Sequence, residues 1–412
     1  MSPVRRKAIL LVIDGLGDLP VPALGGRTPL EAAATPNFDR MAAAGQFGLV
    51  DPLAPGEIPN TDSGVGLLLG LPPGQADRLR RGPVEAAGAG RPLREGEIAV
   101  RANFATLEER PDGLFVRDRR AGRIDEGAAE LAAELNGMQL GGGVEASFLH
   151  TEQHRGVLIL SGPDLDPRVS DTDPGDRTRP AYLRPCEALA PAAAATADRI
   201  NEFVAEAHRR LPRHPLNRAR TAAGEAPATG VITRGAGAFF QPDNVLAARG
   251  LRAATVAGCT TVRGLAAMLG WETRVRSGFT ASLDTDLEGK IDAALQALAD
   301  HDMVYVHVKG PDICAHDRMP VAKRDFLERL DGAVAPLLVG DAIVALSSDH
   351  TTDSNTGAHA ADPVPALIYD PRDAAGASPR TVNFGETDCR GGSLPRLTGS
   401  AFLERVLDRL TG

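Results

Sequence analysis

The chain has 412 residues, 43% of them hydrophobic and 24% charged, which is enough for a large domain with a smaller one and for a substantial core. A net charge of −9 without a basic stripe argues against a nucleic-acid partner. No apolar run approaches the roughly 20 residues of a membrane-spanning helix, which argues against a membrane partner. The short N-terminal apolar run lacks a cleavage site, and the four cysteines form no CxxC pair, so we expect a cytoplasmic protein.

The N-terminal part predicts a buried strand, a helix and a hydroxyl-bearing segment. AILLVI (8–13) is typical of a parallel strand covered on both faces, and Asp14 follows it directly. A helix is expected to begin after Thr35 as N-cap and to end at Gly45. The segment IPNTDSGVGLLLG (58–70) then places Thr61 and Ser63 just before a helix-compatible run. Either hydroxyl could be a nucleophile favoured by the helix N-terminus, or simply a helix cap.

The middle of the chain has a different pattern of apolar and turn-forming residues. Residues 97–124 and 145–162 are typical of antiparallel strands with turns, and 163–185 is a loop rich in Pro, Asp and Arg. We therefore expect residues 86–185 to form a smaller α+β cap domain. It would be inserted into a core made of residues 1–85 and 186–412.

The C-terminal part repeats the strand-and-helix pattern of the start. Apolar periodicity predicts helices over 287–301, 321–338 and 397–410, with buried strands over 303–308 and 342–347. Polar residues follow both of these strands: Lys309 and Asp312 after the first, and Asp349 and His350 after the second. Since the carboxyl ends of parallel strands meet at one sheet edge, where ligands bind, the sequence predicts an α/β fold with a mostly parallel sheet and a site at that edge.

Carboxylates and imidazoles at this edge are typical of a metal site. Asp312 and His316 are four residues apart and would share one helix face, as two ligands of one ion do. Asp349 and His350 are adjacent, so an extended chain would point them in opposite directions, toward two different ions. His359 could fold back over the same edge. Such ligands without thiolates favour Mn²⁺, Mg²⁺ or Zn²⁺, and the alternative is a polar loop with solvated histidines.

Two ions held roughly 3.5–4 Å apart would stabilise an in-line phosphoryl displacement. They would also lower the pKa of a coordinated Ser or Thr hydroxyl.

Nine motifs occur in an order that carries a family resemblance: VIDGLGD, TPLEAAATPNFDRMA, RGPVEAAGAG, RANFATLE, DRRAGRI, VSDTDPG, HVKGPDICAHD, SSDHTT and HAADPVP. Together they resemble the archaeal-type, cofactor-independent phosphoglycerate mutases of the alkaline phosphatase superfamily. The resemblance implies a dimetal phosphotransferase core with an inserted substrate-binding domain. It implies an isomerase of glycolysis and gluconeogenesis that interconverts 3-phosphoglycerate and 2-phosphoglycerate through a phospho-enzyme, without 2,3-bisphosphoglycerate.

The resemblance also implies roles for particular residues. Asp14, Asp349 and His350 would hold one divalent ion together with the nucleophile, and Asp312, His316 and His359 would hold the other. Lys309 would stabilise charge. Substrate-binding positions are matched by Arg81, Arg101, Asn103, Arg119, Arg120, Arg123 and Arg234. In a chain with so many arginines, the alternative for each of these is a solvated surface residue.

The chain departs from the family pattern at the nucleophile. Where the family usually has GSDTAHL, this chain has NTDSGVGLL, so Thr61 occupies the nucleophile position and Ser63 is the alternative. The usual His is Val65. Three functions therefore stay open: the phosphoglycerate mutase, a divergent mutase or phosphatase acting on another small phosphorylated or phosphonate acid, and a metal-binding protein without catalysis. A monomer and a homo-oligomer are both compatible with the sequence.

Overall fold

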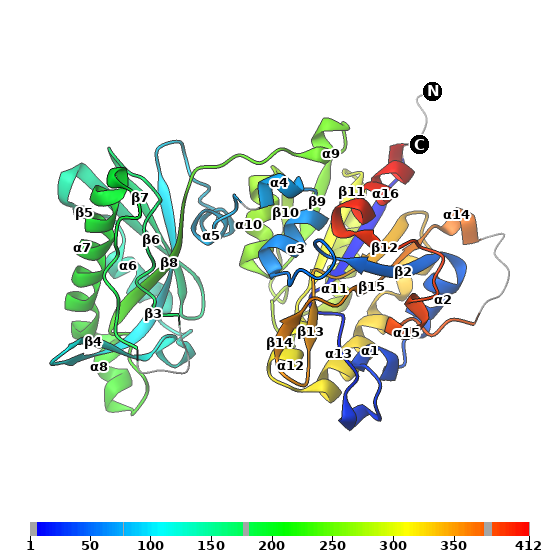
Figure 1. The fold of residues 1–412 in the computed structure, drawn as a ribbon, viewed down its shortest axis with the longest axis horizontal. Helices are drawn as coiled ribbons and strands as arrows, with labels where there is room; N and C mark the ends of the chain where they lie inside the picture. The colour runs from blue at the N-terminus through cyan, green and yellow to red at the C-terminus, as the bar shows by residue number, and fades with distance from the viewer. Residues whose placement is uncertain (1–5, 77, 176–180, 375–380, 412) are drawn as a thin grey trace. The chain divides into compact units, whose positions relative to one another are not determined.

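The computed structural model describes residues 6–76, 78–175, 181–374 and 381–411, and the chain divides into two compact units. We call Met1–Arg78 with Pro242–Gly412 the core unit and Leu79–Gln241 the inserted unit (Figure 1). The inserted unit is larger than the predicted 86–185. Its sheet includes strand β8 (Gly230–Ala238), which pairs with β3 (Ile98–Arg110) over a long sequence separation that local patterns do not reveal.

The core unit is built on an eight-stranded sheet whose first five strands are parallel. In spatial order these five are β10 (Glu272–Arg274), β9 (Ala253–Val256), β11 (Met303–Val308), β1 (Ala8–Ile13) and β12 (Ile343–Ser347). The sheet continues with β15 (Val364–Tyr369), which is antiparallel to both neighbours, then β2 (Gln46–Asp51) and β16 (Leu397–Thr398). The predicted α/β class with a mostly parallel sheet is confirmed.

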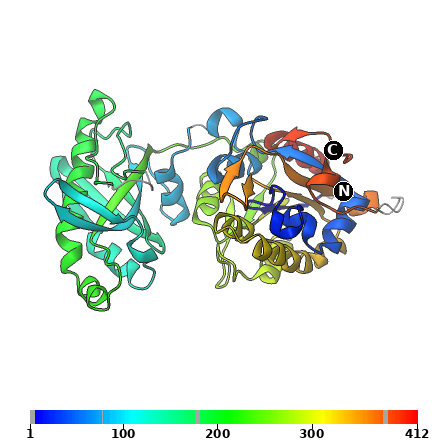
Figure 2. The same cartoon turned by 60° about the horizontal axis from the view of Figure 1, so that its bottom comes forward.

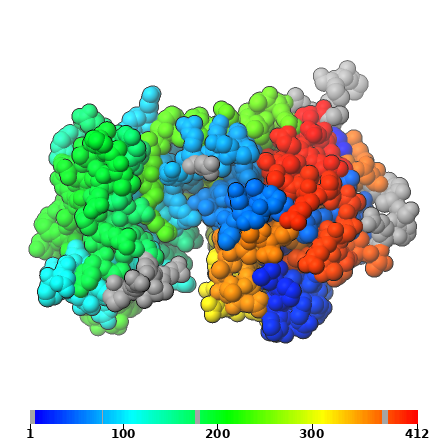
Figure 3. All heavy atoms as spheres, viewed as in Figure 1, coloured from blue at the N-terminus to red at the C-terminus, as the bar shows by residue number. Residues whose placement is uncertain are grey.

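Helices cover this sheet on both faces. On one face, α2 (Pro36–Ala44), α11 (Leu287–Ala297) and α13 (Pro320–Ala333) pack on the sheet through side chains such as Phe38, Ile291 and Phe326. Helices α3 (Thr61–Leu68), α10 (Thr260–Met268) and α16 (Gly399–Thr411) lie on the other side (Figures 1 and 2). The space-filling view shows α16, in red, at the surface beside the blue segment that contains α3 (Figure 3).

The predicted helices of the core unit are present, but two of them end earlier than expected. The helix expected over 287–301 ends at Ala297. The helix expected over 321–338 ends at Ala333 and is followed by a 3₁₀ turn, Ala335–Leu338. Pro336 explains the break, because it has no N–H with which to continue the helical ladder. The shorter elements of the core unit are α1 (Pro29–Ala32), α4 (Pro73–Ala76), α9 (Val245–Ala248), α12 (Gly310–His316), β13 (Thr351–Asp353), β14 (Ala358–Ala360), α14 (Pro371–Ala374) and α15 (Glu386–Cys389).

The inserted unit is an antiparallel sheet centred on β3. This strand pairs with β4 (Gly113–Asp118), β7 (Arg155–Ser161) and β8, and β7 continues to β6 (Val144–Glu152) and β5 (Met138–Leu140). Helices α6 (Ala128–Leu135) and α7 (Ala194–Arg210) share a core with one face of the sheet, while α5 (Arg81–Gly88) packs on the other face. A further helix, α8 (Pro215–Ala222), follows α7. The predicted loop over 163–185 is free of helix and strand where it is described; residues 176–180 lie outside the described part.

The order β11–β1–β12 brings three chain segments to one edge of the parallel sheet. Ile13 is in register with Val308, and Val12 is in register with Ser347. The residues that follow these strands therefore leave the sheet side by side. No helix in the described ranges is both long and apolar enough to cross a membrane.

Candidate active site

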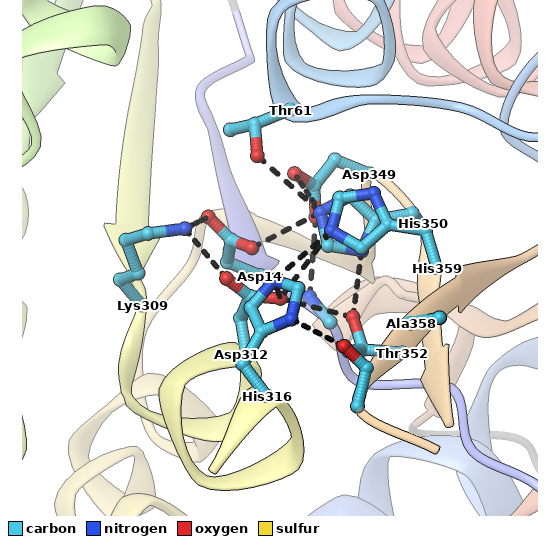
Figure 4. Close-up of polar contacts among 12 residues, drawn as sticks. Asp14, Thr61, Lys309, Asp312, His316, Asp349, His350, Thr352, Ala358 and His359 are labelled. Carbon is cyan, nitrogen blue, oxygen red and sulfur yellow. Dashed lines mark hydrogen bonds and ion pairs between the residues drawn. The ribbon is translucent and has the colours of Figure 1, made fainter. Parts of the chain in front are cut away.

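The carboxyl edge of the parallel sheet carries the predicted metal ligands. Asp14 follows β1, Asp312 and His316 lie on α12 directly after β11, Asp349 and His350 follow β12, and His359 lies on β14. Figure 4 shows these side chains pointing toward one another. Asp14, Asp349 and His350 are fully buried and Asp312 nearly so. Six residues from four segments of the chain thus converge on one polar centre.

One group of three possible ligand atoms comes from Asp312, His316 and His359, and these atoms lie within 4.8 Å of one another. His316 Nδ1 is 2.8 Å from the carbonyl of Gly357, and His359 Nδ1 is 2.9 Å from the carbonyl of Pro59. A carbonyl only accepts hydrogen bonds, so each imidazole must carry a proton on Nδ1. In the neutral ring the lone pair is then on Nε2.

These two lone pairs are directed at the same point. The Nε2 atoms of His316 and His359 are 3.2 Å apart, and they lie 3.2 Å and 3.7 Å from Asp312 Oδ1. Two imidazole lone pairs at this distance repel each other unless a proton or a cation lies between them. Two imidazoles and one carboxylate form a donor set that fits a divalent ion such as Zn²⁺ or Mn²⁺.

A second group of possible ligand atoms comes from Asp14, Asp312 and His350, again within 4.8 Å of one another. His350 Nε2 is 3.3 Å from Asp14 Oδ1 and 3.2 Å from Asp349 Oδ2. Neither of these two oxygens accepts a hydrogen bond, although both are buried. Buried carboxylate oxygens without a hydrogen-bond donor are costly, and a cation at this point would satisfy both.

Asp349 and His350 do not diverge as an extended chain predicts. Residues 348–350 lie between β12 and β13 and are not part of either strand, so the backbone bends there. The amide of Gly15 donates to Asp349 Oδ1 at 3.3 Å, while Oδ2 faces His350. The expectation of two directions was therefore wrong, because it assumed that the strand continues.

The carboxylates of the centre affect each other's charge. Burial raises the pKa of Asp349, and repulsion from Asp14 raises it further, to about 7. Burial also disfavours the charged form of Asp14, but Lys309, His307 and His350 outweigh that effect and hold its pKa well below the ordinary value. Burial lowers the pKa of His350, but Asp349, Asp14 and Asp312 outweigh it and raise the pKa to about 9. Three buried carboxylates thus depend on Lys309 and a protonated His350 for positive charge, and bound cations would supply such charge as well.

Lys309 lies between two of these carboxylates. Its Nζ is 2.8 Å from Asp14 Oδ2 and 2.8 Å from Asp312 Oδ2. Burial lowers the pKa of Lys309, but these two neighbours raise it well above its ordinary value, so the ammonium group stays charged. This position is compatible with the predicted role in stabilising charge.

The two candidate hydroxyls have different surroundings. The N-cap of α3 is neither of them but Asn60, whose side chain accepts from the amide of Ser63 at 3.0 Å. The Ser63 hydroxyl completes this capping box, 3.2 Å from the Asn60 amide and 3.1 Å from its carbonyl. Thr61 Oγ1 instead lies 3.4 Å from His350 Nε2. Because both residues are in the first turn of a helix, they face different sides, unlike in an extended chain.

Two residues at the centre were not predicted. His307 lies inside β11 and is buried, with Nε2 3.1 Å from Asp14 Oδ2. A histidine within the otherwise apolar run MVYVHV is the signal that could have revealed it. Thr352, on β13, hydrogen-bonds to both His350 and Asp312. A threonine in a strand is too common to indicate such a role.

The inserted unit carries a separate cluster of basic side chains. Strand register places Arg101 opposite Arg234, and Asn103 opposite Arg155. Directly opposite residues lie on the same face of a sheet, as do residues two apart in one strand, so all four share the face covered by α5. Arg155 was not predicted, and its position just before the apolar run GVLIL gave no functional signal.

This cluster has more positive charge than its acids balance. Arg101 is buried and lies 3.5 Å from the buried carboxylate of Glu85. Burial lowers the pKa of Arg101 to about 10; Glu85 offsets part of this effect, and Arg234 and Arg81 add to it. The Nε atoms of Arg101 and Arg234 and the Oδ1 atom of Asn103 are buried without a hydrogen-bond partner. Such a cluster fits an anion of the carboxylate or phosphate type.

The three predicted arginines near residue 120 lie on the turn after β4. Arg119 forms a bidentate ion pair with Asp173, with Nε 2.7 Å from Oδ1. Arg120 is half-buried and Arg123 is exposed. Arg123 has a φ of 57°, in the left-handed region that is uncommon for residues other than glycine. The structure thus groups Arg81, Arg101, Asn103 and Arg234, while Arg119 is already paired with an acid.

Comparison with known proteins shows similarity along nearly the whole chain. A family model described as 2,3-bisphosphoglycerate-independent phosphoglycerate mutase matches residues 42–217. A curated relative of that name from Methanopyrus kandleri is 40% identical over 415 residues, which cover 99% of this chain and 97% of the relative. Another of that name, from Ignicoccus hospitalis, is 40% identical and covers 95% and 96% of the two chains.

Solved structures show the same similarity in three dimensions. A cofactor-independent phosphoglycerate mutase from Thermoplasma acidophilum is 30% identical with a TM-score of 0.68, covering 99% of this chain and 100% of the other. A protein structure from Pyrococcus horikoshii gives a TM-score of 0.79 at 29% identity, covering 98% and 97%. The similarity therefore includes both the core unit and the inserted unit.

Proposed function

Because this chain belongs to the family of 2,3-bisphosphoglycerate-independent phosphoglycerate mutases, we propose that it interconverts 3-phosphoglycerate and 2-phosphoglycerate by way of a phosphorylated Thr61. The observation that carries the proposal is the position of Thr61 Oγ1, 3.4 Å from His350 Nε2 at the edge of the carboxylate centre. Family membership makes the chain a phosphoglycerate mutase that uses no 2,3-bisphosphoglycerate. The nucleophile, the ligands and the substrate contacts are parts of our proposal.

In this proposal Asp14, Asp349 and His350 hold one divalent ion together with Thr61, and Asp312, His316 and His359 hold a second. The unsatisfied oxygens of Asp14 and Asp349 support the first assignment, and the facing Nε2 atoms of the two histidines support the second. When bound, the ions supply positive charge for the transferred phosphoryl group and lower the pKa of a coordinated hydroxyl. Mn²⁺ and Zn²⁺ suit these ligands, and Mg²⁺ is a further candidate.

The protein groups have separate tasks in the reaction. The phosphoryl group passes from the substrate oxygen to Thr61 Oγ1 and returns to the neighbouring hydroxyl of the same glycerate, so that no water oxygen enters the product. Lys309, which stays charged between Asp14 and Asp312, balances negative charge close to the nucleophile. Since the helix N-terminus at Thr61 presents backbone amides, it also favours negative charge there.

The basic cluster of the inserted unit is proposed to bind the anionic groups of the substrate. Arg101, Arg234, Asn103 and Arg81 are the predicted members, and we add Arg155. Their support is the burial of unsatisfied Arg101 and Arg234 nitrogens within a cluster of like charge. Planar guanidinium groups match carboxylate and phosphate in a bidentate way. A cytoplasmic location suits substrates of this kind and is part of the proposal.

The test is an assay of the purified protein with 3-phosphoglycerate in the absence of 2,3-bisphosphoglycerate. Protein stripped of metal and then reloaded with Mn²⁺, Zn²⁺ or Mg²⁺ should form 2-phosphoglycerate, and the stripped sample should not. Full activity after stripping would refute the metal requirement. Release of phosphate alone would instead favour a phosphatase, and no reaction with either phosphoglycerate would point to another small phosphorylated acid.

A further inference from the structure

We propose that Thr352 is a positioning residue that joins the two metal sites through its hydroxyl group, an inference that rests on the metal sites of the proposed function. Thr352 lies on β13 and is completely buried. Its Oγ1 is 2.9 Å from His350 Nδ1 and 2.9 Å from Asp312 Oδ1. One hydroxyl therefore contacts a proposed ligand of the first ion and a proposed ligand of the second.

The directions of these two hydrogen bonds follow from their chemistry. The hydroxyl of Thr352 donates to Asp312 Oδ1, because a carboxylate can only accept. The other oxygen of this carboxylate, Oδ2, accepts from the ammonium group of Lys309 at 2.8 Å. With its proton committed to Asp312, Thr352 Oγ1 must accept from His350 Nδ1. His350 then carries a proton on Nδ1, and Nε2 is left to face Asp14 and Asp349.

The backbone of Thr352 is held as firmly as its side chain. Its amide donates to the carbonyl of Gly17 at 3.0 Å, and its carbonyl accepts from the buried ammonium group of Lys323 at 3.3 Å. Lys323 also pairs with Asp18 at 2.7 Å. These contacts tie β13 to the loop after β1, which carries Asp14.

Thr352 also lies beside the third ligand of the second site. In the two-stranded sheet of β13 and β14, it is the direct partner of His359. Gly15 leaves room for the hydroxyl, since a Cβ atom there would approach Thr352 Oγ1 to 2.8 Å. Thr352 is thus fixed relative to ligands of both ions, and its hydroxyl sets the ring orientation of His350 and the carboxylate orientation of Asp312. Groups that orient metal ligands in this way typically contribute tenfold to a hundredfold in metal affinity.

The substitution Thr352→Val tests this inference, because it keeps the branched shape that suits a strand and removes the hydroxyl. The full-length, metal-stripped protein would be titrated with Mn²⁺ by isothermal calorimetry. Wild-type protein should bind two ions, and Thr352→Val should raise the Kd for both by roughly tenfold to a hundredfold. Thr352→Ser, which keeps the hydroxyl, should recover most of the affinity at both sites.

Thr351→Val is the matched control. The Thr351 hydroxyl is next in the strand but donates to the carbonyl of Asp362, 3.0 Å away, and not to a proposed ligand. This variant should bind both ions as wild type does. If Thr352→Val leaves both Kd values unchanged, or weakens only one site, the inference is overturned while the two-ion function stands. Wild-type protein that binds no ion would overturn both.

A measurement on wild-type protein covers the case in which Thr352→Val fails to fold. In the Zn²⁺-loaded protein, proton NMR should show the Thr352 hydroxyl proton and the His350 Nδ1 proton protected from exchange and close to each other. A Thr352 hydroxyl that exchanges rapidly with water would contradict the inference. The Thr352→Ser variant should show the same two protected protons.

Discussion

Thr61 and Ser63 lie in the same helical turn but differ in what their hydroxyl groups contact. Ser63 is used by the capping box with Asn60, whereas Thr61 faces His350. A nucleophile needs a hydroxyl directed at the reacting centre, and a cap needs one directed at the backbone. This difference supports Thr61, where the sequence alone left both residues open.

Thr61→Ala is therefore expected to abolish phosphoryl transfer in a folded protein that still binds metal. Ser63→Ala should keep measurable turnover and cost only about 1 kcal/mol of stability, the usual effect of losing a cap interaction. Steady-state kinetics, metal analysis and thermal unfolding of both variants would check this. Turnover by Thr61→Ala, together with loss of activity in Ser63→Ala, would reverse the assignment.

A substitution of Arg234 tests whether the basic cluster binds the substrate. It lies opposite Arg101 in the sheet and has a buried Nε without a partner. If it binds an anionic group of the substrate, Arg234→Ala should raise KM roughly a hundredfold, as expected for the loss of a buried charged contact, with metal content unchanged. Arg117→Ala, at an exposed position of β4, is the control and should behave as wild type. Equal KM values for the two variants would show that Arg234 and its cluster do not bind the substrate.

At the scale of elements, helix α3 is held close to the turn that carries Asp349. Gly64 lies in its first turn, and a Cβ atom there would overlap the backbone carbonyl of Asp349. Because backbone groups cannot move aside as a flexible side chain does, Gly64→Ala should displace α3 or the Asp349 turn.

We expect Gly64→Ala to weaken metal binding and to reduce activity at least tenfold, an estimate based on the sensitivity of catalysis to small displacements. Gly332→Ala in α13 is the control, since no atom lies within 4 Å of the added Cβ, and it should stabilise the protein by up to about 1 kcal/mol. Mn²⁺ titration and kinetics would show the contrast. Unchanged metal binding in Gly64→Ala would mean that metal binding does not require the close packing of α3 against the Asp349 turn.

The start of β3 is fixed to the end of β7 by a buried carboxylate. Glu97 accepts from Arg91 at 2.9 Å, from the Arg94 amide at 2.7 Å and from the Ser161 hydroxyl at 3.0 Å. Burial raises the pKa of Glu97, but these donors outweigh it and lower the pKa from 4.5 to about 2. A carboxyl group whose pKa is lower in the folded state stabilises the fold above its unfolded pKa.

Glu97→Gln should therefore destabilise the protein at pH 7. The difference from wild type should shrink as the pH falls from about 4.5 toward about 2, where the wild-type carboxyl group also becomes protonated. Urea unfolding at several pH values would measure this, with Glu95→Gln at a neighbouring exposed position as the control. A difference that does not change with pH would show that the charge of Glu97 is not responsible.

The strand ends of the core were predictable because each combines a local apolar run with the polar residue that follows it. This combination is what predicted Asp14, Asp312 and Asp349 as residues of a site at the sheet edge. Contacts that depend on distant segments were not predictable from local patterns. The bend that brings Asp349 toward His350, the hydroxyl contacts of Thr352, and the pairing of β8 with β3 all depend on tertiary structure.

At the scale of the whole molecule, the two units contribute different chemistry. The core unit holds the carboxylates, histidines and hydroxyl of the proposed metal centre, and the inserted unit holds the basic cluster. The relatives share both units over nearly their full length. A mutase has to return the phosphoryl group to the same glycerate, and a phosphatase loses it to water. Retention of the phosphoryl group is thus the property that separates the two activities.

The most direct test follows the phosphoryl group of 3-phosphoglycerate in water enriched in ¹⁸O, using Mn²⁺-loaded protein and phosphorus NMR. Transfer to Thr61 and back predicts 2-phosphoglycerate whose phosphate contains no ¹⁸O, little free phosphate, and no product from Thr61→Ala. Accumulation of ¹⁸O-labelled phosphate without 2-phosphoglycerate would contradict the account, because the phosphoryl group would then have passed to water.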